Sequence, residues 1–216
     1  MLILNLLSNP PYLFGVIAGF IIGFTFHEFS HAWMANRLGD NTARLSGRLT
    51  LNPLSHVALL GTISLVIIGF GWGKPVPLNP NKIKDPNGTI KVALSGVTAN
   101  LIVALVFGLI LRVATASGIA IDNSTFMNFV SGILFVNLML IAFNIIPIPP
   151  LDGSKVIEGF LSYESIVRYE QAGPMVLYAI IIGQIFFNIP ILSTVLEPII
   201  RFLSFVTTGM PNLFGF

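Results

Sequence analysis

Residues 12–36 read YLFGVIAGFIIGFTFHEFSHAWMAN, and this apolar stretch decides the fold. As a helix it is long enough to cross about 30 Å of hydrocarbon. It nevertheless contains His27, Glu28 and His31, and Glu28 is the only charged residue before Arg37. Because a charged side chain at the centre of a membrane costs roughly 2.5–3.5 kcal/mol, these three residues indicate a function.

The spacing of the two histidines predicts a metal site. On a helix, positions four apart lie on one face and about 6 Å apart along the axis, so both imidazoles can reach one Zn²⁺. Glu28 follows His27 and can accept a proton from a water molecule that the metal activates. The pattern could occur by chance in a structural helix, but hydrocarbon surrounds this helix, and burying these polar side chains there without a function is unfavourable. We therefore expect an intramembrane zinc hydrolase with His27 and His31 as ligands and Glu28 as general base.

The composition is that of an integral membrane protein. Of 216 residues, 54% are hydrophobic and 9% are charged, whereas a soluble domain has about 25% charged residues. A net charge of +2 is too small to suggest a nucleic-acid partner. The chain has no cysteine, so metal ligands must be His, Asp, Glu or main-chain carbonyls. We expect a single membrane-embedded domain over residues 1–216.

Hydropathy predicts an all-α polytopic membrane protein with about five transmembrane helices and a short re-entrant segment. After the first span, we expect apolar helices at 92–116, 126–147, 174–189 and 191–206. The last of these either spans the membrane or lies in the interface, since Glu197, Arg201 and Ser204 could share one face. Segment 57–72 is apolar but short and contains three glycines, so we expect it to enter the membrane and return.

The basic residues predict the orientation of the chain. Loops 37–56 and 73–91 hold seven of the eleven Lys and Arg residues, and the positive-inside rule places both loops in the cytoplasm. Segment 57–72 must then be re-entrant, the N-terminus lies outside the plasma membrane, and the histidines lie toward the cytoplasmic face. The span that precedes Asp152 also runs inward and brings it to this face. A full crossing at 57–72, the alternative, would move Asp152 to the opposite side.

Two residues compete to be the third zinc ligand. A catalytic zinc usually has three protein ligands and an open position. Asp152 follows two prolines and precedes Gly153 at the end of a span, where its carboxylate could face a metal. It could also be an ordinary turn aspartate. His56 is the only other histidine, and a loop cap or a hydrogen bond near the site is favoured for it over ligation.

Two ordered motifs resemble those of the site-2 protease family of intramembrane zinc metalloproteases. The first is His27-Glu28-Phe29-Ser30-His31, which matches the family's HExxH in one span. The second is Asn144-Ile145-Ile146-Pro147, followed by Leu151-Asp152-Gly153, which matches the family's Asn-x-x-Pro…Leu-Asp-Gly at the end of a later span. Stretches 47–53 and 73–77 also look like those of small bacterial and archaeal members, which lack PDZ and CBS domains.

The resemblance implies functions for individual residues. It makes Asp152 the third zinc ligand and places Asn144 near the reacting carbonyl, where its amide could stabilise the oxyanion. It also implies a transmembrane protein as substrate, cleaved within or near its membrane segment. The chain departs from the family pattern just after His56 and just before Asn100, so the roles of those two residues stay open.

Two further functions are open. A non-proteolytic relative would only bind membrane segments, which the intact Glu28 argues against. A metal-ion transporter would have polar residues along several helices, whereas here they gather at one depth.

A protease must also hold its substrate unwound, and segments 44–52 and 74–79 look extended enough to bind it by strand addition.

Overall fold

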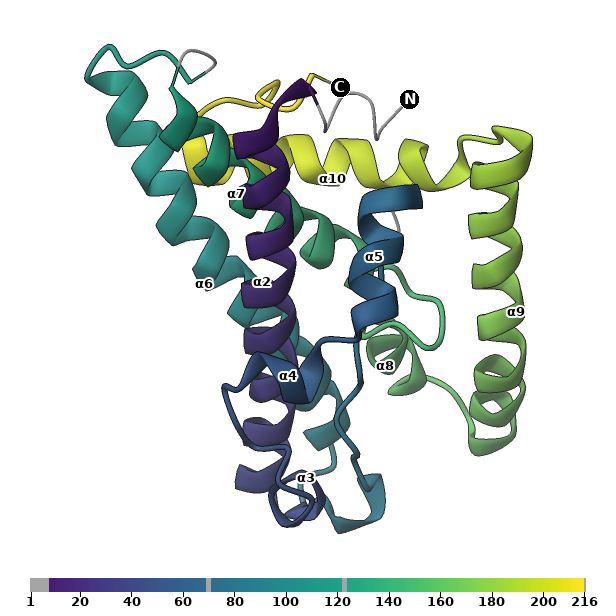
Figure 1. Ribbon diagram of the computed structural model, residues 1–216. Coiled ribbons are helices and arrows are strands. Elements are labelled where there is room, and N and C mark those ends of the chain that lie inside the picture. The colour runs from purple at the N-terminus through teal and green to yellow at the C-terminus, as the bar shows by residue number, and fades with distance from the viewer. Residues whose placement is uncertain (1–7, 69–70, 122–123, 216) are drawn as a thin grey trace.

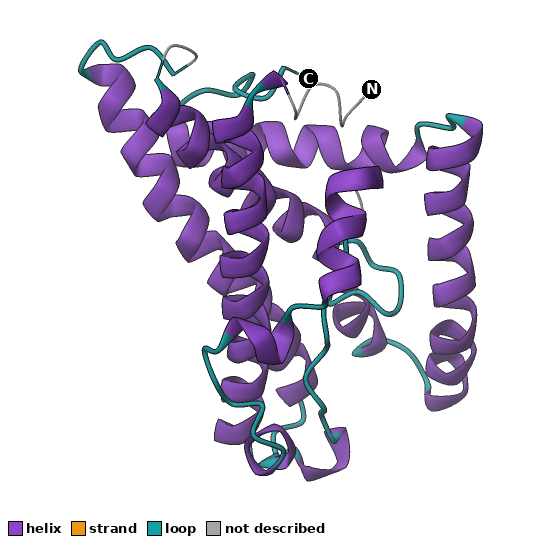
Figure 2. Cartoon of the chain, in the orientation of Figure 1, coloured by secondary structure: helices purple, strands orange, loops and turns teal. Residues whose placement is uncertain are grey.

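The computed structural model describes residues 8–68, 71–121 and 124–215, and in these ranges the chain is built of helices and loops (Figures 1 and 2). The prediction of an all-α fold is therefore confirmed. Five helices are long and apolar enough to cross a membrane. They are α2 (Pro10–Arg37), α6 (Gly88–Ala116), α7 (Thr125–Asn144), α9 (Tyr163–Phe187) and α10 (Ile191–Thr208).

Side-chain caps begin the two helices that lead into the site. The side chain of Asn9 accepts a hydrogen bond from the Tyr12 amide at 3.3 Å, and two prolines occupy the first turn of α2. Ser124 caps α7 in the same way through the Met127 amide. Past the other end of α2, Gly39 has a φ of 111°, a conformation that glycine adopts without strain.

Helices α2, α6 and α7 pack together and form the centre of the molecule. Small residues allow α2 and α7 to approach closely. A Cβ added at Gly15 would lie 2.1 Å from the Phe129 carbonyl oxygen, and one added at Gly19 would lie 2.7 Å from the Ile133 Cα. The close contact sets the position of α2, and therefore of its histidines, relative to the end of α7.

Segment 57–72 turns back on itself, as predicted. Helix α5 (Leu59–Ile68) has 10 residues, about 15 Å, which is half the thickness of the hydrocarbon core. Val57 and Gly73 form an antiparallel bridge, and the Lys74 amide donates to the His56 carbonyl at 2.6 Å. The two ends of the segment thus lie side by side in the structure. Residues 69–70 lie outside the described ranges.

The structure differs from the predicted elements at several helix boundaries and within the polar loops. Helix α9 begins at Tyr163, before the predicted start at 174, and continues through Pro174. Short helices α3 (Thr42–Leu45) and α8 (Gly153–Glu158) occupy polar sequence. Of the two segments expected to be extended, 44–52 begins inside α3, whereas 74–79 has no helix and is not paired as a strand with another described segment, so its role in substrate binding stays a prediction. Apolar composition marks the lipid-facing part of a helix, but polar turns can extend the helix beyond it.

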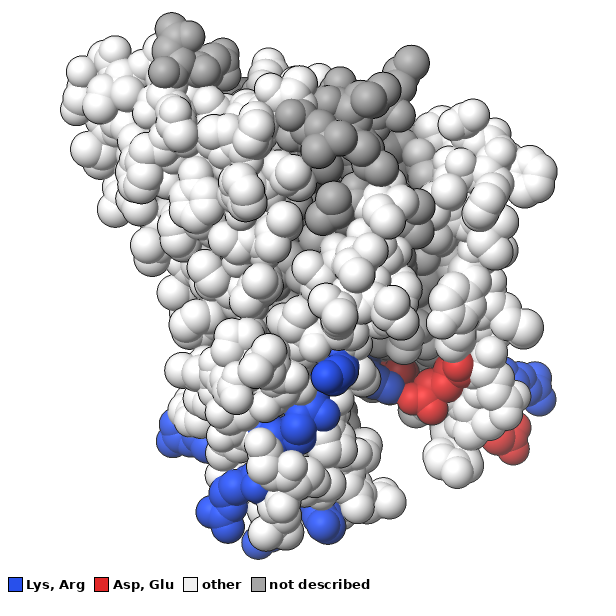
Figure 3. All heavy atoms as spheres, viewed as in Figure 1, with Lys and Arg blue, Asp and Glu red and all other residues white. Residues whose placement is uncertain are grey.

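The two polar loops lie at one end of the molecule. Figure 1 shows α3 and α4 (Pro53–His56) beside the C-terminal end of α2, while α10 lies across the opposite end. Lys and Arg gather at the first end in the space-filling view, and the opposite end of that face carries neither (Figure 3). The seven basic residues of these loops are Arg37, Arg44, Arg48, Lys74, Lys82, Lys84 and Lys91.

Candidate metal centre

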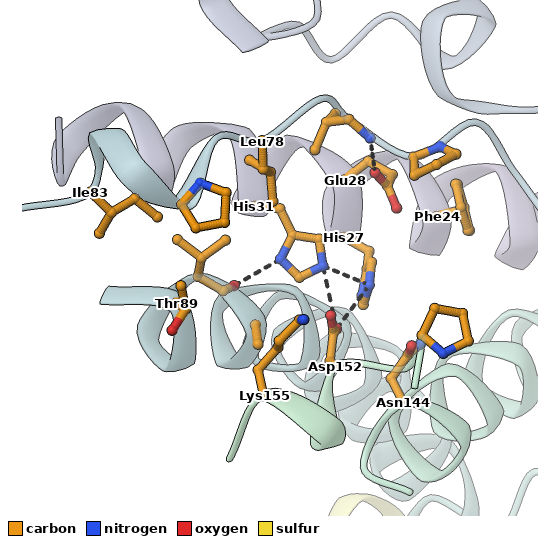
Figure 4. Close-up of a pocket in the computed structure, with 16 residues that line it drawn as sticks. Phe24, His27, Glu28, His31, Leu78, Ile83, Thr89, Asn144, Asp152 and Lys155 are labelled. Atoms are coloured by element: carbon orange, nitrogen blue, oxygen red, sulfur yellow. Dashed lines mark hydrogen bonds and ion pairs between the residues drawn. The ribbon is translucent and has the colours of Figure 1, made fainter. Parts of the chain in front are cut away.

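The two histidines and Asp152 come together from distant parts of the sequence (Figure 4). His27 and His31 lie in the C-terminal half of α2, and Asp152 lies in the turn that joins α7 to α8. The two Nε2 atoms are 3.0 Å apart, and Asp152 Oδ2 lies 3.2 Å from the first and 3.3 Å from the second. All three side chains are largely buried, so three potential ligand atoms form a compact triangle inside the protein.

The size of the triangle fits a zinc ion. In a tetrahedral site with bonds of about 2.0–2.2 Å, neighbouring ligand atoms are about 3.3–3.6 Å apart. The observed separations of 3.0–3.3 Å lie at this value or a few tenths of an ångström below it. Two imidazole nitrogens and one carboxylate oxygen are also ligand types that zinc prefers in catalytic sites.

The hydrogen bonds behind the histidines leave lone pairs directed into the triangle. His27 Nδ1 lies 2.8 Å from Asn100 Oδ1, and His31 Nδ1 lies 2.7 Å from the Val92 carbonyl. Since both oxygens only accept, each Nδ1 carries a proton, and a neutral ring then keeps its lone pair on Nε2. Asp152 Oδ2 is buried and has no hydrogen-bond donor among the described residues. With both rings neutral, three lone pairs face one another, and a bound cation would remove their repulsion.

Glu28 lies beside the triangle but is held by a different contact. Its carboxylate and one nitrogen of each histidine lie within 4.8 Å of one another, which makes it a second candidate for the third ligand. However, Glu28 Oε2 accepts a hydrogen bond from the Val76 amide at 2.7 Å, whereas Asp152 Oδ2 faces both histidines. The geometry therefore favours Asp152 as the ligand and leaves Glu28 next to the metal position.

In the segment 75–77, which contacts Glu28, only one residue has a main-chain N–H. Val76 stands between Pro75 and Pro77, which have no N–H, and its own side chain is buried. The loop is fastened by Asp40, which is fully buried and accepts hydrogen bonds from the amides of Asn79 (2.6 Å) and Thr42 (3.0 Å). Burial opposes ionisation of Asp40, but these hydrogen bonds outweigh it and lower the pKa of the carboxyl group.

A cavity of about 290 Å³ lies over the triangle and Glu28. Its apolar lining includes Phe24, Leu78, Ile83 and Pro150. Asn144, the last residue of α7, also lines it, and its Nδ2 donates to the Leu140 carbonyl at 2.9 Å. A primary amide has two N–H groups, so one donor of Asn144 is not used by this bond. The cavity therefore combines an apolar lining with a polar group on the α7 side.

His56 is not part of the triangle. It is fully buried in the loop region, and its Nε2 lies 2.7 Å from the Thr50 carbonyl. Of the two residues whose roles were open, Asn100 is the one that contacts a histidine of the triangle. An asparagine within a predicted span is a signal that could have identified it. The contacts of Val76 and Val92 use main-chain atoms, which no side-chain pattern reveals.

Comparison with known proteins places the chain in a family. The model of peptidase family M50 matches residues 112–186. YwhC of Bacillus subtilis (strain 168) is 36% identical over 90% of this chain and 88% of its own length. Rip2 of Mycolicibacterium smegmatis is 32% identical over 69% of this chain and 58% of its own, and MJ0611 of Methanocaldococcus jannaschii is 29% identical over 63% and 65%.

The names of these three relatives describe them as candidate zinc metalloproteases. No solved structure is significantly similar to the chain. The match to YwhC covers most of both proteins, and the five long apolar helices are those of a multi-pass membrane protein. The chain therefore belongs to the site-2 protease family, peptidase family M50, whose members are membrane metalloproteases.

Proposed function

We propose that the chain is an intramembrane zinc endopeptidase that hydrolyses peptide bonds within or near the transmembrane segments of other membrane proteins. One observation carries the proposal: His27, His31 and Asp152 converge beside Glu28, and three of these four residues lie in an apolar helix long enough to span a membrane. In this proposal, residues 1–216 act as one domain. The test is cleavage of a single-span protein in liposomes by the full chain and by its Glu28→Gln variant.

The proposed chemistry divides between the ligands and Glu28. Zinc held by His27, His31 and Asp152 would polarise the scissile carbonyl and acidify a water molecule. The Glu28 carboxylate accepts the proton of the attacking water and then donates it to the leaving amine. The Val76 amide holds one oxygen of this carboxylate, which leaves the other free for proton transfer. The apolar cavity limits bulk water at the scissile bond.

Asn144 is the proposed oxyanion donor, through the amide hydrogen that Leu140 does not use. Asn144→Ala is expected to lower kcat by about 10²–10³-fold, because one donor to the transition state is lost. Zinc content and KM should change little, since the residue donates to neither histidine nor Asp152. Steady-state cleavage and zinc stoichiometry, measured on one preparation, check this. A kcat within twofold of wild type would remove Asn144 from the mechanism.

We also propose that the basic end of the molecule lies in the cytoplasm and that water enters the site from there. The chain has no cysteine, so single cysteines can report the orientation. Ser46 and Ser117 are a matched pair, because each is exposed, follows a helix and donates to a carbonyl four residues back. A membrane-impermeant maleimide added outside is expected to label Ser117→Cys, and to label Ser46→Cys only after lysis. The reverse pattern would invert the orientation.

A further inference from the structure

Helix α6 presents a stripe of three residues, each four positions from the next, to the two histidines of α2. The Val92 carbonyl contacts His31 and the Asn100 side chain contacts His27. Between them, Gly96 leaves room for the rings, since an added Cβ would lie 2.5 Å from His31 Cε1 and 2.7 Å from His27 Cε1. The spacing of four on α6 thus matches the spacing of four on α2.

The Asn100 amide has only one satisfactory orientation. Asn100 is fully buried, and its Nδ2 donates to the Gly23 carbonyl at 3.0 Å and to Asn137 Oδ1 at 3.1 Å. Asn137, also fully buried, donates its own Nδ2 to the Ile133 carbonyl at 2.9 Å, which turns its oxygen toward Asn100. A flipped Asn100 amide would place its oxygen against two acceptor oxygens, so the oxygen must face His27.

We infer that Asn100 and Asn137 are positioning residues that fix His27 with its proton on Nδ1 and its Nε2 lone pair directed at the metal. The hydrogen bonds run in one direction, from His27 to Asn100, from Asn100 to Asn137, and from Asn137 to the main chain of α7. The Gly23 carbonyl and Asn137 Oδ1 together fix the Asn100 amide, and its oxygen in turn keeps a proton on His27 Nδ1. This inference rests on the proposed zinc-binding role of His27.

The chemistry of an amide suits this position. Zinc would bring two positive charges, and Glu28 and Asp152 bring two negative charges, so the proposed site is neutral with neutral histidines. An asparagine orients the imidazole without adding charge, whereas a carboxylate behind His27 would leave a net negative charge inside the membrane, which is costly. Asn100 therefore combines the function of an orienting group with the low charge that burial requires.

Zinc affinity distinguishes this function from simple helix packing by polar groups. The full chain in detergent is titrated with zinc against a chelator, and cobalt replaces zinc in a parallel sample whose visible absorption reports ligand geometry. Asn100→Ala is expected to weaken zinc affinity about 10–100-fold, the range for loss of a partner behind a metal ligand. Asn137→Ala should weaken zinc affinity less than Asn100→Ala does. Both variants should shift the cobalt spectrum, and in the same direction. The double variant should bind zinc no more weakly than Asn100→Ala.

Ser131→Ala is the matched control, because Ser131 is buried on α7 and, among the described residues, its hydroxyl bonds only to the carbonyl of Asn128 in its own helix. It should leave zinc affinity and the cobalt spectrum unchanged. Wild-type affinity in Asn100→Ala, or losses that multiply in the double variant, would overturn the inference. If Asn100→Ala does not fold, Asn137→Ala decides, since it leaves the direct partner of His27 in place; unchanged affinity there overturns the inference.

The zinc titration also separates this inference from the proposed protease activity. If the asparagine variants lose zinc affinity as expected but the wild-type protein cleaves no membrane substrate, the activity is refuted and the positioning role stands. If the wild-type protein cleaves its substrate but both asparagine variants keep wild-type zinc affinity, the positioning role is refuted and the activity stands.

Discussion

Replacing Glu28 by Gln is expected to lower the cleavage rate by about 10²–10⁴-fold, the contribution of a general base, while zinc binding is retained. Glutamine has nearly the same shape, and its Oε1 can still accept the hydrogen bond from the Val76 amide. It cannot accept a proton from water at neutral pH. The expected result is a folded, zinc-loaded protein that binds its substrate and leaves it uncleaved.

Cleavage of a single-span protein in liposomes and zinc stoichiometry by elemental analysis measure this result. Glu164→Gln is the control, because Glu164 is an exposed residue in the first turn of α9 and the same charge is removed. The control should cleave like wild type. Retained cleavage in Glu28→Gln would refute the role of Glu28, and loss of zinc in that variant would instead make Glu28 a ligand.

Replacing Asp152 by Asn is expected to have an effect of similar size for a different reason. The variant keeps the shape of the side chain but removes the negative charge that faces both histidines at 3.2 and 3.3 Å. We expect zinc affinity to fall by more than about 100-fold, since loss of a direct ligand should exceed the 10–100-fold loss seen for partners behind ligands. Cleavage should then fall with zinc content and recover in part at high zinc concentration.

Competition with a chelator measures the zinc affinity of this variant. Asp85→Asn is the control, because Asp85 lies in a loop and pairs with Lys91 away from the site. It should bind zinc like wild type. His56→Gln extends the test to the competing ligand: we expect this variant to keep its zinc. Loss of zinc in His56→Gln, together with unchanged affinity in Asp152→Asn, would reverse the assignment.

Much of the fold could be predicted because hydropathy and helix length are local properties. The apolar stretch at 12–36 is a span whatever it packs against, and α2 covers it. The short length and glycines of segment 57–72 likewise favoured a re-entrant turn over a full crossing, and the pairing of Val57 with Gly73 agrees with this. The start of α9 could not be predicted, because the polar residues that precede the apolar segment are equally compatible with a loop.

The HExxH spacing and the later Asp152 defined the candidate site because both are side-chain patterns along the chain. By itself, the sequence identified the candidate residues for the chemistry and placed three of them in an apolar stretch long enough to span a membrane. Only the tertiary structure decided that Asp152 faces both histidines, that a main-chain amide holds Glu28, and that Asn100 contacts His27. These contacts join residues far apart in the sequence, and they depend on how closely α2, α6 and α7 pack, which no local pattern encodes.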